Sequence, residues 1–284
     1  MWFSTKGIIA AYVQRMWTGV LIGTLGAIST EIWSASWIIL ELNLISFLIM
    51  ITGRWPAKKT GIIYFIVQRI GTLIILRGGV IAEWSSPLTH WVILGLLLKT
   101  RMAPFHFWGA NLITKLSGKT SFVFLTWQKI APLFIMMVTT SKYFIRWVLI
   151  LNILVATRCR IGSKNLFVLL FFSGLIHVCW IISSPITVAR VYFFIYSCSS
   201  MPIFLITHNL SLLIMNLAGL PPLTGFFMKL KVLQIARLRW GFVLLLASAP
   251  LLYAYIRSFL INSSSQRDKI KITTISVCSM GLIL

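Results

Sequence analysis

Long apolar segments, separated by short stretches rich in polar residues, glycine and proline, follow one another along the whole chain of 284 residues. About 20 apolar residues in a helix cross the roughly 30 Å hydrocarbon layer of a membrane, where lipid offers the backbone no hydrogen-bond partners. The pattern therefore predicts an all-α fold, a polytopic membrane helix bundle of about eleven transmembrane helices, or about ten if the last segment is peripheral. The segments lie near residues 8–29, 32–52, 60–82, 88–110, 119–140, 143–157, 165–183, 187–207, 209–235, 238–261 and 270–284.

The same pattern bears on domain organisation. It contains no soluble domain, low-complexity linker or short-period repeat, so we predict a single transmembrane domain over residues 1–284. The first apolar stretch continues as a full span rather than ending at a cleavage site, so we expect no removable signal.

Composition supports the membrane interpretation. Hydrophobic residues make up 58% of the chain and charged residues 11%, against roughly 45–50% and 25% in soluble domains. A formal net charge of +22 would suggest nucleic-acid binding in a soluble protein. Here the lysines concentrate in short gaps between apolar segments, so we expect the lipid bilayer as a partner and no nucleic acid.

Lysines in the gaps also predict the orientation of the chain. The odd-numbered loops offer Lys142 together with Glu31 and Glu83. By the positive-inside rule, the N-terminus and the even loops face the negative compartment, a cytoplasm or a mitochondrial matrix. The lysines of the even loops, with the N-terminal lysine on their side, are Lys6, Lys58, Lys59, Lys115, Lys119, Lys164, Lys269 and Lys271.

No motif for a bound cofactor or metal is visible. The four cysteines form no C-x-x-C pair and have no histidine at zinc-finger spacing. Neither G-x-G-x-x-G nor the phosphate-binding G-x-x-x-x-G-K-[ST] occurs. We therefore expect no metal site and no cofactor-binding site in this chain.

Four ionisable residues fall inside apolar segments: Glu41, Lys99, Lys129 and Lys229. Charges are costly at that depth, so we take these residues as the candidate catalytic residues. Burial disfavours the charged form of a lysine, which enables it to take and release a proton. Because Glu41 is the only acid deep in a segment, we expect it to lie within reach of Lys99 and to modulate it.

Each of the three lysines has a helix-breaking residue close by. Proline removes a backbone donor and frees carbonyl groups, which persist in membranes where they line a polar cavity. We therefore expect interruptions near residues 102–104 and 220–225, with polar groups beside them. The breaking residues are Pro104 after Lys99, Pro132 after Lys129, and Gly219, Pro221, Pro222 and Gly225 before Lys229.

Less specific interpretations remain for these side chains. An intramembrane lysine can extend to the interface or form one structural ion pair. His106 and His177 fit packed, hydrogen-bonded residues better than proton carriers, and His90 and His208 lie near segment ends.

Five motifs resemble one family and occur in its order between about residues 37 and 231. The chain is similar to the NADH dehydrogenase (ubiquinone) subunit 2 family, the mitochondrial antiporter-like membrane subunits of respiratory complex I. The motifs are Leu40-Glu-Leu-Asn-Leu-Ile-Ser-Phe47, Tyr64-Phe65 with Gln68, Met102-Ala-Pro-Phe-His-Phe-Trp108, Leu125-Thr-Trp-Gln-Lys-Ile-Ala-Pro132 and Gly219-Leu-Pro-Pro-Leu-Thr-Gly-Phe226.

The resemblance implies a role for each candidate residue. Glu41 matches the family's intramembrane glutamate, and Lys99 the lysine thought to pair with it. Lys129 matches the central proton-carrying lysine, and Lys229 the terminal one toward the exit side. These roles imply proton translocation through a Glu/Lys chain at the bilayer midplane, driven by quinone reduction elsewhere in the complex.

The resemblance also implies the setting of the chain. It implies an antiporter-like fold with broken helices, a matrix-side N-terminus in the mitochondrial inner membrane, and other membrane-arm subunits of complex I as partners. The chain would be a subunit of an H⁺-translocating NADH:ubiquinone reductase that binds no cofactor itself, while the whole complex uses NADH and ubiquinone. Alternatives are a free-standing cation/proton antiporter and a membrane scaffold with inert ion pairs.

The chain contains thirteen arginines and only four acidic residues, too few to pair with all of them. Arg69, Arg77 and Arg101 lie within or beside apolar segments, where an arginine is costly. Invertebrate mitochondria read the codons AGA and AGG as serine, and a small hydroxyl packs well between helices. We therefore hypothesise that many of these arginines are serines translated with the standard code.

Overall fold

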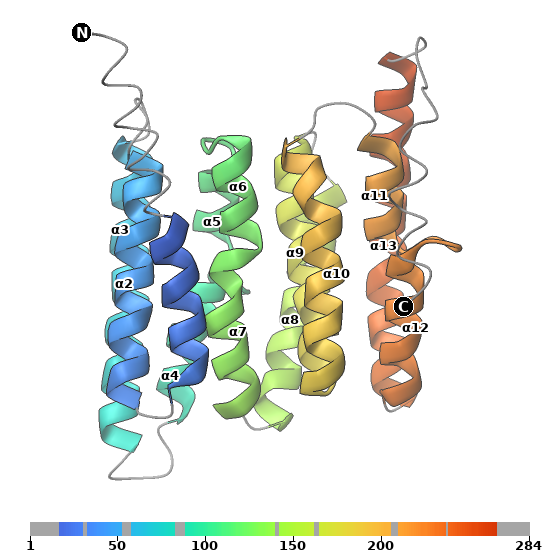
Figure 1. Ribbon diagram of the computed structural model, residues 1–284. Helices are drawn as coiled ribbons and strands as arrows, with labels where there is room; N and C mark the ends of the chain where they lie inside the picture. Colours follow the sequence, from blue (N-terminus) through green and yellow to red (C-terminus); the bar gives the residue numbers. More distant parts are fainter. Residues whose placement is uncertain are drawn as a thin grey trace, which may run out of the picture. The chain divides into compact units, whose positions relative to one another are not determined.

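In the computed structural model, helices make up all the regular secondary structure of the described residues, which are 17–30, 33–52, 58–82, 89–139, 142–161, 165–205, 210–236 and 238–265 (Figure 1). This confirms the predicted all-α class for the described chain. Every predicted segment up to residue 261 contains described helix, and the predicted segment 270–284 lies outside the described residues.

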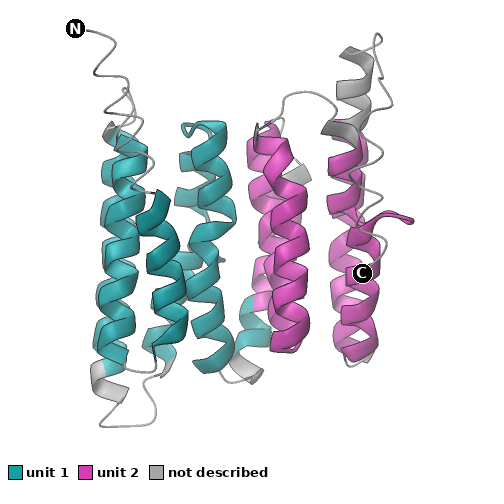
Figure 2. Ribbon diagram, viewed as in Figure 1, with its two compact units in different colours: residues 1–148 teal, residues 149–284 magenta. Residues whose placement is uncertain are grey.

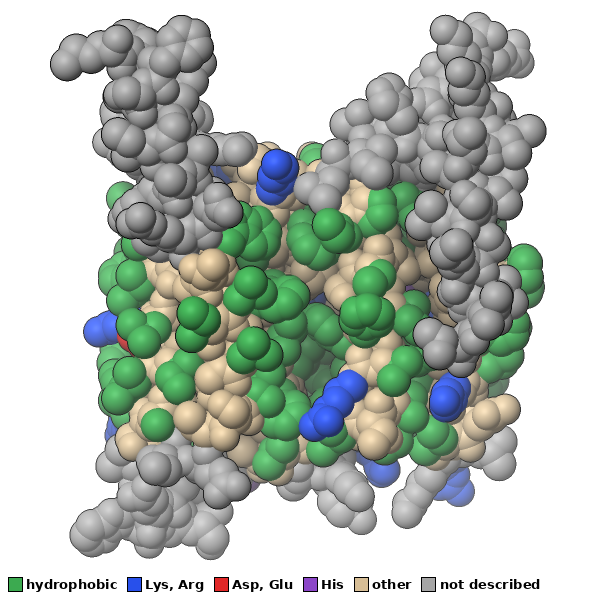
Figure 3. All heavy atoms as spheres, viewed as in Figure 1, with side chains coloured by type: hydrophobic (Ala, Val, Ile, Leu, Met, Phe, Trp, Pro, Cys, Tyr) green, Lys and Arg blue, Asp and Glu red, His purple; other side chains and the backbone are tan. Residues whose placement is uncertain are grey.

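Six described helical stretches are long and apolar enough to cross a membrane, and Trp17–Ser29 and His90–Thr100 are shorter apolar helices. On the face shown in Figure 3, hydrophobic side chains cover the described helices of both units and lysines and arginines are few. A large exposed apolar surface fits lipid rather than water, so the chain is an integral, multi-pass membrane protein. The six stretches are Trp33–Thr52, Lys59–Gly79, Gly118–Thr139, Leu166–Ser183, Ile186–Phe204 and Arg239–Ser258.

Residues divide into two compact units, Met1–Val148 and Leu149–Leu284 (Figure 2). Each unit contains one of the predicted helix interruptions. The single transmembrane domain stays a prediction, as does the orientation of the chain. Lys6, Lys164, Lys269 and Lys271, on which the orientation partly rests, lie outside the described residues.

In the first unit, α3 packs against both α2 and α4, and α4 packs against α7. Buried aromatic rings of this unit pack on one another, with the centroids of Phe47 and Tyr64 5.1 Å apart and those of Phe47 and Phe124, a residue of α6, 6.2 Å apart. The helices are α2 (Trp33–Thr52), α3 (Lys58–Ala82), α4 (Thr89–Thr100), α5 (Phe107–Ile113), α6 (Gly118–Leu125), α7 (Trp127–Thr139) and the first part of α8 (Lys142–Ile161).

In the second unit, α9 is buried along most of its length and contacts α10, α12 and α13. Asn152 of α8 donates to the Leu175 carbonyl of α9 at 2.9 Å, which satisfies a polar side chain inside an apolar bundle. The remaining helices are α9 (Leu166–Ser183), α10 (Ile186–Leu205), α11 (Leu210–Ala218), α12 (Thr224–Ile235) and α13 (Leu238–Ser265).

Both predicted interruptions are confirmed. One apolar segment is divided into α4 and α5 by residues 101–106, and another into α11 and α12 by residues 219–223. Near Lys129 the helix breaks at Thr126, whereas Pro132 lies inside α7. Thr126 offers a reason, because its hydroxyl and its N–H both bond to the Phe122 carbonyl, at 2.7 and 2.9 Å, and Lys129 N–H then bonds back only three residues, to Thr126.

Candidate functional site

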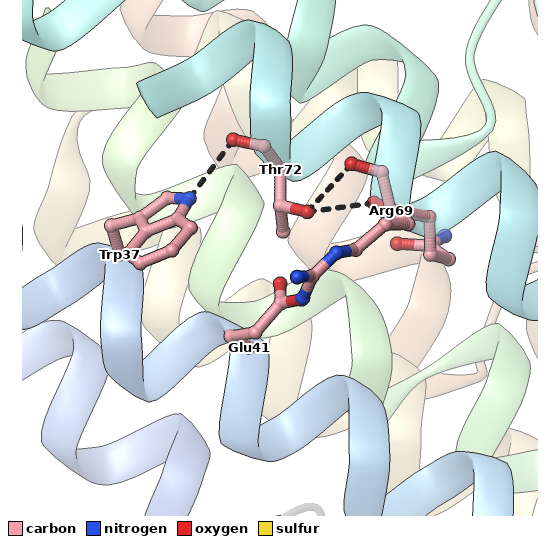
Figure 4. Close-up of polar contacts among 5 residues, drawn as sticks. Trp37, Glu41, Arg69 and Thr72 are labelled. Atoms are coloured by element: carbon pink, nitrogen blue, oxygen red, sulfur yellow. Dashed lines mark hydrogen bonds and ion pairs between the residues drawn. The ribbon is translucent and has the colours of Figure 1, made fainter. Parts of the chain in front are cut away.

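Glu41 of α2 forms an ion pair with Arg69 of α3 (Figure 4). The Glu41 side chain is 11% exposed and that of Arg69 43%, so the arginine extends from the helix surface to a carboxylate in the interior. Beside this pair, Trp37 Nε1 donates to the Thr72 carbonyl at 3.0 Å and fixes α2 against α3. A buried carboxylate needs such a partner because it has lost its hydration.

Lys99 lies in the last turn of α4 and is 4% exposed. Its stem packs closely on α3, since a Cβ atom placed on Gly71 would lie 3.3 Å from Lys99 Cγ. Gln68 Nε2 donates to the Lys99 carbonyl at 3.3 Å, which satisfies an acceptor at the end of the helix. Helix α3 therefore carries both the ion-pair partner of Glu41 and the surface against which Lys99 packs. The predicted pairing of Glu41 with Lys99 stays a prediction.

At the end of α4 the chain turns through Arg101, whose φ of +62° lies in the left-handed region. Arg101 N–H bonds to the Leu98 carbonyl at 3.4 Å and Met102 N–H to the Leu97 carbonyl at 3.1 Å, the two bonds of a Schellman helix end. The buried guanidinium stacks on Phe124, with 3.9 Å between Cζ and the ring centroid. A cation–π contact thus holds this charge beside the interruption.

Lys129 is 1% exposed and sits in the first turn of α7. Next to it, Gln128 Nε2 donates to Asn43 Oδ1 of α2 at 3.1 Å. The hydroxyl of Tyr64 on α3 donates to Gln128 Oε1 at 3.5 Å. Two motifs far apart in the sequence, those containing Glu41 and Lys129, therefore meet through Asn43 and Gln128.

Lys229 on α12 is 7% exposed, and its Nζ donates to the Ala218 carbonyl at the end of α11 at 2.6 Å. This carbonyl belongs to the negative end of α11, where a cation is favoured. Gly219 follows in the left-handed region with φ +79°, and a Cβ on it would lie 2.7 Å from Nζ. Lys229 therefore closes back onto the interruption that precedes it.

Polar groups surround this second interruption, as predicted. Asn216 bonds to Ser199, Thr224 and Gly225. A cavity of about 20 Å³ adjoins it, and such a volume holds about one water molecule. Its lining includes Ser199, Asn216, Gly225, His177, Tyr192 and Tyr196. His177 Nδ1 lies 3.0 Å from the Tyr192 hydroxyl, so this histidine is packed and hydrogen-bonded.

The sequence did not predict the partners of Glu41 and Lys229. Arg69 could have been suspected as the partner of Glu41, because it is an arginine inside an apolar segment. The Ala218 carbonyl could not have been suspected as the partner of Lys229, because every residue carries such a backbone group. Arg77 lies over Trp91, with Cζ 5.6 Å from the ring centroid. The hypothesis that such arginines are serines stays a prediction. Within the described ranges, no group of three or more His, Cys, Asp or Glu is placed to hold a metal.

Comparisons with known proteins identify the family. No protein-family model matches the chain. NADH-ubiquinone oxidoreductase chain 2 of Aedes aegypti is 27% identical over 321 residues, covering 93% of this chain and 94% of that protein. The same protein of Mytilus edulis is 30% identical over 241 residues, covering 75% and 74%.

A solved structure agrees at the level of the fold. A chain of respiratory complex I from Thermus thermophilus superposes with a TM-score of 0.80 at 18% identity, covering 88% of this chain and 70% of that one. Because the Mytilus edulis protein is 30% identical and the match covers 75% of this chain and 74% of that protein, the chain belongs to the NADH-ubiquinone oxidoreductase chain 2 family.

Proposed function

We propose that this chain is a core membrane-arm subunit of proton-pumping NADH:ubiquinone oxidoreductase, and that it translocates protons through Glu41, Lys99, Lys129 and Lys229. The observation that carries the proposal is the burial of all three lysines next to interrupted helices, in a chain whose relatives are chain 2 of this enzyme. Quinone reduction, and with it the use of NADH and ubiquinone, takes place elsewhere in the complex. The setting is the mitochondrial inner membrane, with the N-terminus on the matrix side and other membrane-arm subunits as partners.

Each residue has a role that follows from its surroundings. A buried lysine exchanges protons readily because its charged form has lost hydration. Glu41 controls Lys99: an ionised carboxylate favours the lysine's proton and a neutralised one does not. Arg69 competes for the same carboxylate, so the balance between the two cations sets how strongly Glu41 acts on Lys99. Lys129 relays the proton, and Lys229 delivers it toward the far side or a neighbouring subunit.

Replacement of Lys129 by methionine tests the proposal. Methionine keeps an unbranched apolar stem and removes only the titratable head, so we expect normal assembly with proton translocation coupled to quinone reduction at least about tenfold lower, a barrier change of about 1.4 kcal/mol. Lys119, exposed at the start of α6, provides the matched Lys119→Met control, which should pump normally. Unchanged pumping by assembled Lys129→Met complex would favour a scaffold, and purification of the chain alone, without a large NADH-oxidising assembly, would favour a free-standing antiporter.

A further inference from the structure

Asn216, on α11 and 7% exposed, uses its side chain to join three helices. Its Nδ2 donates to Ser199 Oγ of α10 at 2.9 Å. Its Oδ1 accepts from Gly225 N–H at 2.9 Å and from the Thr224 hydroxyl at 3.1 Å, both at the start of α12. The side-chain oxygen thus has both acceptor sites filled.

Asn216 caps α12 from a different helix. The first N–H groups of a helix have no partner within it, and the N-cap residue Leu223 makes no side-chain cap. Asn216 supplies the missing acceptor to Gly225 instead. The approach is so close that a Cβ atom on Gly225 would lie 2.1 Å from the Asn216 main-chain oxygen, which explains the glycine there.

The residues that Asn216 holds are those that set the position of Lys229. Lys229 follows Gly225 by four residues and lies on the same face of α12. Its acceptor, the Ala218 carbonyl, follows Asn216 by two residues on α11. In addition, the Asn216 carbonyl accepts from Gly219 N–H at 3.0 Å and so helps to close the turn after Ala218.

We propose that Asn216 is the positioning residue of the Lys229 site. It fixes the start of α12 against the end of α11 and thereby keeps the Ala218 carbonyl within reach of the Lys229 ammonium. Lys229 then holds its proton at one defined place beside the interruption. This inference rests on the proposed function, in which Lys229 transfers protons.

Three variants test the positioning role in the assembled complex. Asn216→Leu removes the hydrogen bonds at similar volume, so we expect proton translocation about tenfold lower per assembled complex. Asn216→Asp keeps an oxygen that accepts from Gly225 and Thr224, so it should keep the start of α12 in place. Its carboxylate also adds a charge at the Lys229 site, so hydrogen exchange rather than pumping is the readout for this variant. Asn152→Leu removes another buried asparagine of the same unit, which bonds to α9, and should lower stability without lowering pumping per assembled complex.

Double substitution separates this inference from the proposed function. With Lys229→Met present, Asn216→Leu should cause no further loss, because residues that act as one unit are not additive. If Lys229→Met alone leaves pumping intact, the proposed role of Lys229 is wrong. If Lys229→Met lowers pumping while Asn216→Leu does not, or if the two losses add, only the positioning role is wrong.

Hydrogen exchange of the peptide spanning residues 219–226 provides a readout apart from activity. Asn216→Leu should speed exchange there, whereas Asn216→Asp and Asn152→Leu should leave it unchanged. Should Asn216→Leu fail to assemble, Thr224→Val removes one of the donors to Asn216 at little cost in volume. It should give a smaller loss of pumping and faster exchange in the same peptide, and unchanged values for both would overturn the proposal.

Discussion

The helices before the two interruptions, α4 and α11, end in the same type of turn, but the lysine beside each interruption is bonded in a different way. Both α4 and α11 close with a Schellman turn, through Arg101 in one case and Gly219 in the other. Lys99 precedes its interruption and its main chain is held by Gln68, whereas Lys229 follows its interruption and its ammonium bonds back to the turn. At the second site the ammonium group of the lysine itself bonds to the main chain at the interruption. At the first site a side chain of the neighbouring helix α3 bonds to the main chain of the lysine instead.

The largest expected effect comes from Gly219→Ala. A Cβ at this φ of +79° is strained by about 1–2 kcal/mol, and it would lie 2.7 Å from Lys229 Nζ. We expect lower thermal stability and loss of pumping together, measured on assembled complex. Gly241→Ala is the control, because its added Cβ meets only the end of the Leu233 side chain at 3.3 Å. Normal pumping by Gly219→Ala would show that the turn and Lys229 are not coupled.

A moderate effect is expected from Arg69→Ser. The substitution leaves Glu41 without its ion-pair partner. Removing one member of a buried pair costs about 3–5 kcal/mol, and we expect less, about 1–2 kcal/mol, because Arg69 is the more exposed member. Pumping should then depend more strongly on Lys99, so Lys99→Met should cause a larger loss in the Arg69→Ser background than alone. Equal losses in the two backgrounds would argue against competition for Glu41.

Arg101→Gly should have the smallest effect and is the counterpart of Gly219→Ala. Glycine removes the strain of a left-handed backbone, which is about 1–2 kcal/mol for other residues. Loss of the guanidinium contact with Phe124 costs about 0.5–2 kcal/mol. The two terms oppose each other, so the change in thermal stability should be smaller than for Gly219→Ala. Arg101→Ala keeps the backbone cost and loses the contact, and should be less stable than both. The mass of a peptide containing residue 101 from the native protein also tests whether serine stands there.

Much of the fold could be predicted because membrane insertion imposes strong local rules. Segment length located the helices up to residue 261, and the clusters around Pro104 and Pro221 located both interruptions, because proline and glycine act on the backbone in place. Pro132, named as the helix-breaking residue near Lys129, lies inside α7, and the helix is interrupted instead at Thr126. A threonine bonding back to the main chain is a weaker local signal than proline.

By itself, the sequence determined the class of protein, its helices and the candidate residues Glu41, Lys99, Lys129 and Lys229, because the cost of burying a charge in lipid depends mainly on its depth along a helix. Only the tertiary structure decided what two of these charges meet: Arg69 for Glu41 and the Ala218 carbonyl for Lys229. It also decided that Asn216 caps α12 from another helix. These contacts depend on which helix faces lie together and on backbone atoms that every residue carries, and neither is written in residue types or spacing.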